Sequence, residues 1–154
     1  NMNNLHFLSQ EIFQYKEDVI NVCQNHLKLL SNNEDKDIIE NILKDFLLND
    51  FTFLSLQEVN FLKLNDKNKW VDYIIYRWKF KNYGKMKKIP KFPLYLIVEP
   101  TSICNLRCSM CFQSDESFSS NKEFMGKMDL KLFTKIIDEA AVCGTKALTL
   151  ASRG

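Results

Sequence analysis

The chain has 154 residues, of which 45% are hydrophobic and 26% charged, and its formal net charge is +2. These values exclude a disordered or collagen-like chain, and the length suits one domain or two small ones. No uncharged apolar run reaches the roughly 18 residues of a transmembrane helix. Residues 1–10 lack the basic start and apolar stretch of a signal peptide, so we expect a cytoplasmic chain without membrane contact.

The charge is unevenly distributed along the chain. Residues 1–66 contain eleven acidic and five basic residues, residues 67–92 contain nine basic and one acidic, and residues 93–154 contain seven of each. A basic segment of this kind can bind nucleic acid or phosphate. No aromatic–basic motif accompanies the lysines. We therefore expect a lysine-rich linker that docks on the acidic part, and no nucleic-acid partner.

The first part of the chain predicts a helical domain over residues 1–84. Ser9 is positioned to cap a first helix, and residues 38–47 have the apolar pattern of a second, amphipathic one. Apolar positions at three- and four-residue steps mark the first helix: Ile12, Phe13, Val19, Ile20, Cys23, Leu27 and Leu30.

Two further helices are expected before residue 84. Ser55 and Glu58 have the spacing of a capping box, which predicts a short helix to about Leu64. Asp66 is positioned to cap a fourth helix, and Gly84 suits its C-terminal exit. Apolar anchors of this fourth helix are Trp70, Val71, Ile74, Ile75 and Trp78.

The pattern changes after Gly84. Residues 85–92 form a basic linker in which Pro90 disfavours a helix. The apolar run 94–98 predicts a strand buried on both faces. Asp129 can cap a helix over residues 130–143, which Gly144 ends, and residues 146–150 predict a second strand.

The order strand, loop, helix, strand predicts a right-handed βαβ unit with parallel strands. Its helix has one apolar stripe, formed by Leu130, Phe133, Ile136, Ile137 and Ala140. The fold class is therefore α/β, with an N-terminal helical domain followed by the first βαβ unit of an incomplete barrel-like domain over residues 93–154. A two-stranded sheet has two open edges, so we expect a homodimer that pairs them or a disordered cysteine loop.

Three of the five cysteines, Cys104, Cys108 and Cys111, lie within eight residues of one another. Cys23 and Cys143 stand apart, and we expect both to pack in a core. Without a secretion signal, clustered thiols indicate a metal or redox chemistry. A [4Fe–4S] cluster usually takes four cysteine thiolates. Three sulfurs on a tight loop would leave one iron open to a substrate or cofactor.

Zinc is the main alternative ligand for this triplet. A structural zinc site needs four ligands, usually in closely spaced pairs. Cys143 could be the fourth, but it closes an amphipathic helix and is expected to face the sheet. His6 and His26 lie in the helical part. The triplet therefore favours an iron–sulfur cluster over zinc or unligated thiols.

This loop resembles the radical S-adenosylmethionine (SAM) superfamily, whose signature is Cys-x3-Cys-x2-Cys after the first strand of a partial (β/α) barrel. The surrounding residues, Glu99-Pro100-Thr101, Asn105-Leu106 and Met110-Cys111, look like the SPASM-type and maturase branches. The resemblance covers about residues 92–154. It implies that Cys104, Cys108 and Cys111 each ligate one iron of a [4Fe–4S] cluster and that SAM chelates the fourth.

The resemblance also implies further contacts with SAM. The residue before the last cysteine is commonly aromatic in the family and lies beside the adenine; here it is Met110, and Phe112 is a neighbour that can share this role. Ser152-Arg153-Gly154 looks like the start of the motif that receives the SAM amino group, with Gly154 at the cofactor.

The family's reaction is reductive cleavage of SAM to a 5′-deoxyadenosyl radical, which abstracts hydrogen from a substrate. Its electron donor would be a flavodoxin or ferredoxin, and the substrate is unknown, with a peptide or protein one option. A complete (β/α)8 barrel takes about 250 residues, so we expect this chain alone to be catalytically incompetent.

Two other functions remain open from the sequence. The helical residues 1–84 can be an interaction module that delivers a peptide or protein, with basic residues 79–91 as an electrostatic docking strip. The cysteine loop can instead be a zinc-stabilised binding module without redox chemistry, which metal content would distinguish.

Overall fold

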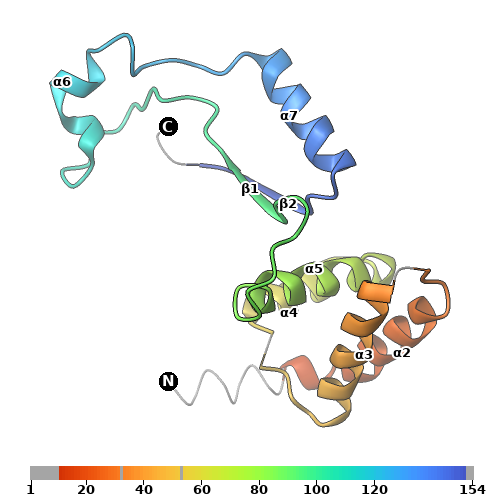
Figure 1. Ribbon diagram of the computed structural model, residues 1–154. Coiled ribbons are helices and arrows are strands. Elements are labelled where there is room, and N and C mark those ends of the chain that lie inside the picture. The colour runs from red at the N-terminus through yellow and green to blue at the C-terminus, as the bar shows by residue number, and fades with distance from the viewer. Residues whose placement is uncertain (1–10, 32, 53, 152–154) are drawn as a thin grey trace. The chain divides into compact units, whose positions relative to one another are not determined.

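The computed structural model describes residues 11–31, 33–52 and 54–151. The chain divides into two compact units, Asn1–Ile89 and Pro90–Gly154. The first is helical and the second holds a parallel sheet, so at a coarse level the fold is α/β (Figure 1). Among the helices that the structure describes, none has the length and apolar character required to cross a bilayer.

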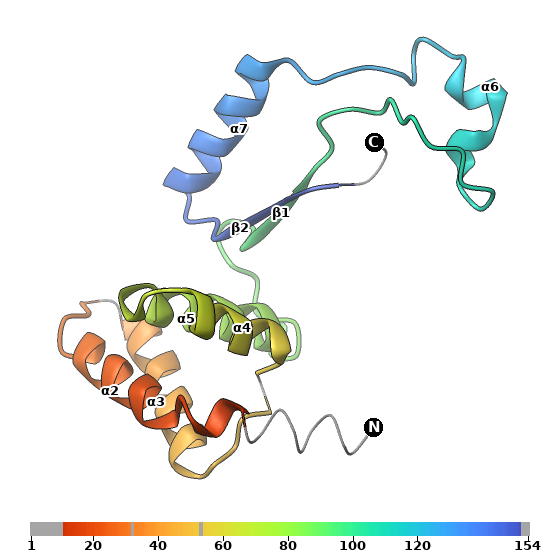
Figure 2. The same cartoon turned by 180° about the vertical axis from the view of Figure 1, so that it is seen from behind.

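The helical unit contains α2 (Lys16–Leu27), α3 (Asn33–Leu47), α4 (Leu56–Leu64), the 3-10 turn η1 (Lys67–Lys69) and α5 (Trp70–Asn82). Helix α5 packs against each of the other three helices, as the two opposite views show (Figures 1 and 2). Together they enclose one apolar core. Its most deeply buried members include Val19, Cys23, Ile39, Ile42, Phe46, Leu62 and Ile74.

The predicted core residues of this unit are largely confirmed. Cys23 is fully buried, and burial raises the pKa of its thiol to about 12. Trp70 is buried, and Trp78 packs against the core while partly exposed. The thiol of Cys23 is therefore an apolar packing group without a nucleophilic role.

Three details of these helices differ from the expectation. The proposed cap Ser9 lies outside the described residues. Residues 11–13 are helical, as expected, but a turn in which Tyr15 N–H donates to Ile12 C=O separates them from α2, which begins at Lys16. Asp66 makes no side-chain cap and precedes η1, so α5 starts at Trp70. Beyond α5 the positive φ, 53°, belongs to Lys87 and not to Gly84. A helix that ends in a glycine C-cap would have its left-handed residue at Gly84, whereas here the tight turn after Tyr83 has it three positions later, at Lys87.

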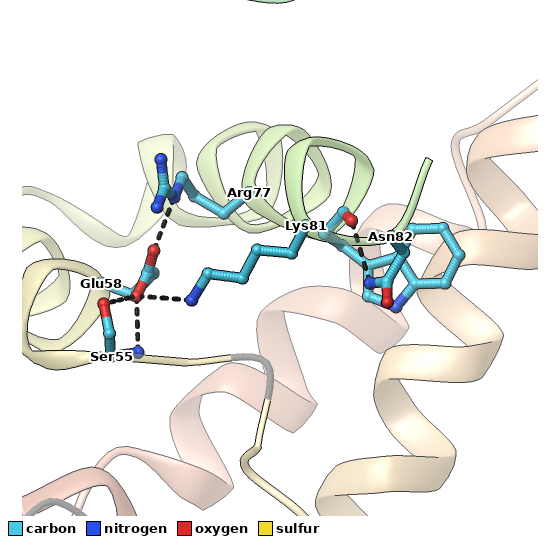
Figure 3. Close-up of polar contacts among 6 residues, drawn as sticks. Ser55, Glu58, Arg77, Lys81 and Asn82 are labelled. Carbon is cyan, nitrogen blue, oxygen red and sulfur yellow. Dashed lines mark hydrogen bonds and ion pairs between the residues drawn. The ribbon is translucent and has the colours of Figure 1, made fainter. Parts of the chain in front are cut away.

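A buried carboxylate links α4 to α5. The predicted capping box forms, and Glu58 accepts hydrogen bonds from the backbone N–H of Ser55 at 2.5 Å and from its hydroxyl. Arg77 Nε lies 2.5 Å from Glu58 Oε1 and Lys81 Nζ 3.3 Å from Oε2 (Figure 3). Glu58 has no exposed surface and Arg77 is only 9% exposed. A carboxylate in this position is tolerated because its charge and hydrogen-bonding capacity are met.

The second half of the basic segment folds back onto α3. Lys79 Nζ lies 2.6 Å from Asp35 Oδ1, Lys88 pairs with Glu34, and the Tyr83 hydroxyl donates to Glu34 Oε1 at 2.8 Å. The hydrogen bonds from Lys88 and Tyr83 outweigh burial and hold the pKa of Glu34 below its usual value. This agrees with a lysine-rich segment that docks on the acidic part.

The second unit contains β1 (Tyr95–Val98), η2 (Phe112–Ser114), α6 (Glu116–Ser119), α7 (Leu130–Val142) and β2 (Ala147–Leu150). The two strands pair in parallel, with Tyr95 opposite Ala147 and Val98 opposite Leu150. The Asp129 carboxylate caps α7 by accepting from Lys131 N–H at 2.6 Å. Gly144 ends the helix with φ +89°, a conformation that favours glycine. Both of these local predictions are confirmed, as are both strands.

The predicted burial of this unit is partly wrong. Ile97 is 63% exposed and Leu130 76% exposed, although both were expected in a core, and Cys143 is also exposed. A parallel strand is buried on both faces only when helices cover both. The described part of this unit has one long helix, α7, which can cover at most one face. Only Ala140 of the α7 stripe is fully buried.

We predict that Glu58→Gln lowers the free energy of unfolding of the helical unit by about 3–5 kcal/mol, because the charge of Arg77 would lose its buried partner. Burial by itself raises the pKa of Glu58. The hydrogen bonds from Ser55 and Arg77 and the charge of Lys81 lower it by more, so the pKa lies below its usual value. A depressed carboxyl pKa stabilises the fold above the unfolded value of about 4.3, and this contribution is lost as the pH falls through the folded value.

Urea unfolding followed by far-ultraviolet circular dichroism at neutral and at acid pH measures both effects. The variant should have a shallower acid dependence than the parent chain. The control is Glu40→Gln, which removes an exposed carboxylate on α3 and should change stability by no more than about 0.5 kcal/mol. Equal losses in both variants would contradict the role of the buried pair.

Candidate functional site

The three clustered cysteines follow β1 on a long excursion whose two ends are joined by backbone hydrogen bonds. Ser102 N–H donates to Gly126 C=O at 2.9 Å, and Met128 N–H donates to Pro100 C=O at 2.8 Å. Between them, Thr101 and Lys127 form an antiparallel bridge. The excursion therefore starts and ends at one place, directly beyond the carboxyl end of β1.

Ser102 also closes a smaller loop inside this excursion. Gln113 Nε2 donates to Ser102 C=O at 2.7 Å, and Gly126 N–H donates to Ser102 Oγ at 2.7 Å. Ser102 is 8% exposed and Gln113 4% exposed. We call residues 103–112, which lie between Ser102 and Gln113 and contain all three thiols, the cysteine loop. Its two ends are held together by hydrogen bonds that are buried and therefore shielded from competing water.

The thiols on this loop are chemically available. None is in a disulfide; Cys104 and Cys111 are half-buried and Cys108 is exposed. Cys111 N–H donates to Cys108 C=O at 2.9 Å, and Ser114 Oγ donates to Cys111 C=O at 2.6 Å. Two of the three cysteines thus share one hydrogen-bonded turn, and the turn continues into η2.

The donor set of the cysteine loop is of the soft, sulfur type that both iron–sulfur clusters and zinc accept. Three cysteines lie on one loop, and Cys143, the possible fourth ligand of a zinc site, is exposed after the end of α7. His26 lies on α2 in the helical unit, and His6 is outside the described residues. Over the described part of the chain, no three histidine, cysteine or acidic side chains are gathered closely enough to hold a metal ion. The ligand set Cys104, Cys108 and Cys111 therefore stays a prediction.

The residues expected beside SAM are placed differently from one another. Met110 is 95% exposed on the cysteine loop. Phe112 is 55% exposed, and its ring packs edge-to-face on Phe118 with centroids 4.9 Å apart. Phe118 in turn stacks on Phe124 at 5.1 Å. Phe112 thus packs in an aromatic cluster with Phe118 of α6 and Phe124 after it. Met110 is exposed to solvent, and Gly154 lies outside the described residues.

Sequence reasoning missed the residues that close the loop. Ser102 and Gln113 are 11 positions apart and Ser102 and Gly126 24 positions apart. Neither pair has a local signature, because serine, glutamine and glycine are ordinary loop residues. The aromatic residues at 112, 118 and 124 were the one signal available, since a regular spacing of apolar rings in an otherwise polar loop indicates a local cluster.

Comparison with known proteins gives one short similarity. Over 49 residues the chain is 49% identical to the tungsten-containing aldehyde ferredoxin oxidoreductase cofactor-modifying protein of Pyrococcus furiosus. The match covers 30% of this chain and 12% of that protein, so this chain spans only a small part of the length of its relative. No family model matches the chain, and no solved structure does.

We predict that Gln113→Ala loosens the cysteine loop, because the Ser102 carbonyl loses a buried hydrogen-bond donor. A hydrogen bond of this kind contributes about 1 kcal/mol net, which corresponds to about fivefold faster exchange of the amides it protects. Hydrogen–deuterium exchange at Cys111 N–H and Gly126 N–H measures this directly. Asn105→Ala is the matched control, since it removes an exposed amide from the same loop. Unchanged exchange in Gln113→Ala would show that the contact does not close the loop.

Proposed function

We propose that this chain is part of a radical SAM enzyme and that its cysteine loop holds a [4Fe–4S] cluster through Cys104, Cys108 and Cys111. The observation that carries the proposal is the Cys-x3-Cys-x2-Cys triplet on a loop that follows a parallel strand and is closed at its base by Ser102. The similarity to a protein named as cofactor-modifying supports an enzymatic role of this kind. Under this proposal β1, α7 and β2 are the first βαβ unit of a partial barrel.

Each part of the loop has a role in this proposal. The three thiols are the protein ligands in this proposal, and a set of three leaves one iron of the cluster available for SAM. A cluster with SAM bound would supply one chemistry, the one-electron cleavage of SAM to a 5′-deoxyadenosyl radical. Ser102, Gln113 and Gly126 fix the ends of the loop. Because metal binding is linked to local folding, iron is expected to draw the three thiols together.

Met110 has the freedom to take the place beside the adenine. It is unbranched and polarizable, is 95% exposed, and lies in the same turn as Cys108 and Cys111. Phe112 would have to leave its edge-to-face contact with Phe118 to serve the same purpose. We therefore assign the adenine contact to Met110 first. The electron donor, a flavodoxin or ferredoxin, and a peptide or protein substrate belong to the same proposal.

Anaerobic reconstitution with iron and sulfide, followed by metal analysis, tests the ligand set. We predict about four irons per chain in the parent protein, as for a [4Fe–4S] cluster, and a large loss of iron in each of Cys104→Ser, Cys108→Ser and Cys111→Ser. Serine preserves size and polarity but is a poor ligand for iron in these clusters.

Cys143→Ser is the matched control, because it removes an exposed thiol of the same unit that lies outside the loop. It should retain the full iron content and the visible absorption of the parent. Zinc bound in preference to iron, or equal losses in all four variants, would contradict the proposal and favour a structural metal module.

A further inference from the structure

The helical unit contains a hollow that the cluster proposal does not use. It lies between α3, the segment after α3 and the C-terminal end of α5, and has a volume of about 510 Å³ open to solvent. This is within the roughly 300–1,000 Å³ range of ligand-binding pockets. We call it the α3–α5 hollow. The lining residues used below are Asn41, Asp45, Trp78, Asn82, Lys85 and Met86.

Hydrogen-bond acceptors from both α3 and α5 line the hollow. Asn41 Nδ2 donates to Asp37 C=O at 2.8 Å and Asn82 Nδ2 to Trp78 C=O at 3.0 Å, so each amide is oriented by its own helix (Figure 3 shows Asn82). An amide oriented in this way still offers its side-chain oxygen as an acceptor. The half-buried carboxylate of Asp45 adds a negative charge, and within the described residues no hydrogen bond or ion pair reaches it. Acceptors, a carboxylate and an indole together suit a cationic group.

The charge of Asp45 is poorly compensated by the protein itself. Burial raises the pKa of Asp45, the carboxylate of Asp50 raises it further, and only Lys44 acts in the opposite direction. Lys85 lines the same hollow, but among the described residues no ion pair joins its ammonium group to the Asp45 carboxylate. Each of the two opposite charges is therefore available to a ligand.

The lining of the hollow also includes basic and apolar groups. Lys85 is exposed, and no ion pair holds its ammonium group in the part of the chain that the structure describes. Lys81, one turn earlier, is held by Glu58 at 3.3 Å, which fixes that wall of the hollow (Figure 3). Met86, 58% exposed, and the partly exposed Trp78 provide apolar surface between the charged groups.

We propose that the α3–α5 hollow binds a peptide segment that carries one basic and one acidic side chain. The basic group pairs with Asp45 and the two asparagine oxygens and lies near the indole of Trp78. The acidic group pairs with Lys85, and the intervening backbone crosses Met86. This inference goes beyond the proposed function and does not depend on the cluster, so either can fail without the other.

The test is an NMR titration of the full chain with the capped tripeptide lysine–glycine–glutamate, using the indole N–H of Trp78 as the reporter. The indole of Trp70 is an internal control, because it is buried and donates to Asn65 C=O at 2.8 Å. We expect the Trp78 resonance to shift and that of Trp70 to stay. The capped neutral peptide glutamine–glycine–glutamine should bind at least about fivefold more weakly, since both charge pairs are lost.

Asp45→Asn and Lys85→Gln should each weaken binding by about fivefold or more. The matched controls Asp72→Asn and Lys87→Gln make the same charge changes at exposed positions outside the hollow and should bind like the parent chain. The proposal is overturned if the neutral peptide binds equally well, if free lysine alone gives the same shift and affinity, or if no peptide moves the Trp78 resonance. Equal weakening by the control variants would also overturn it, because it would indicate a non-specific charge effect.

Discussion

One serine holds together the part of the molecule on which the proposed chemistry depends. Ser102 contributes its carbonyl to Gln113, its hydroxyl oxygen to Gly126 N–H and its own N–H to Gly126 C=O. These contacts return the chain after the cysteines to the end of β1, so the cysteine loop begins and ends beside the sheet. A loop without such a closure would lose more conformational entropy on binding a metal and would bind it less tightly.

The helical unit also depends on one residue that joins several segments, in this case a buried charged residue, Glu58. Glu58 begins as a local capping residue for α4 and also receives Arg77 and Lys81 from α5. One carboxylate thus sets the start of a helix and the contact between two helices. The same arrangement fixes Lys81 on one wall of the α3–α5 hollow, and the ends of that hollow carry charges that remain available. The buried and paired charge of Glu58 stabilises the fold of this unit. The charges of Asp45 and Lys85, which are in no ion pair among the described residues, are the groups to which we assign a ligand.

Local signals in the sequence predicted local features well. The Ser55–Glu58 capping box, the Asp129 cap, the Gly144 exit and the parallel pairing of the two strands are all present. The Gln113–Ser102 and Arg77–Glu58 contacts could not be predicted, because each joins residues that are distant in sequence and chemically ordinary. The exposure of Ile97 and Cys143 was missed because the apolar pattern of a strand or helix indicates which face is available for burial. Whether another element covers that face is a property of the tertiary fold.

The central claim is that the cysteine loop supplies three ligands and leaves one iron for SAM. Electron paramagnetic resonance of the reduced, reconstituted protein, recorded with and without SAM, tests it most directly. If one iron lacks a protein ligand, adding SAM changes the spectrum, and SAM labelled with carbon-13 in its carboxylate shows a coupling to the cluster. A full cluster whose spectrum is identical with and without SAM would mean that the loop holds an ordinary electron-transfer centre, and the assignment of this chain to radical SAM chemistry would be wrong.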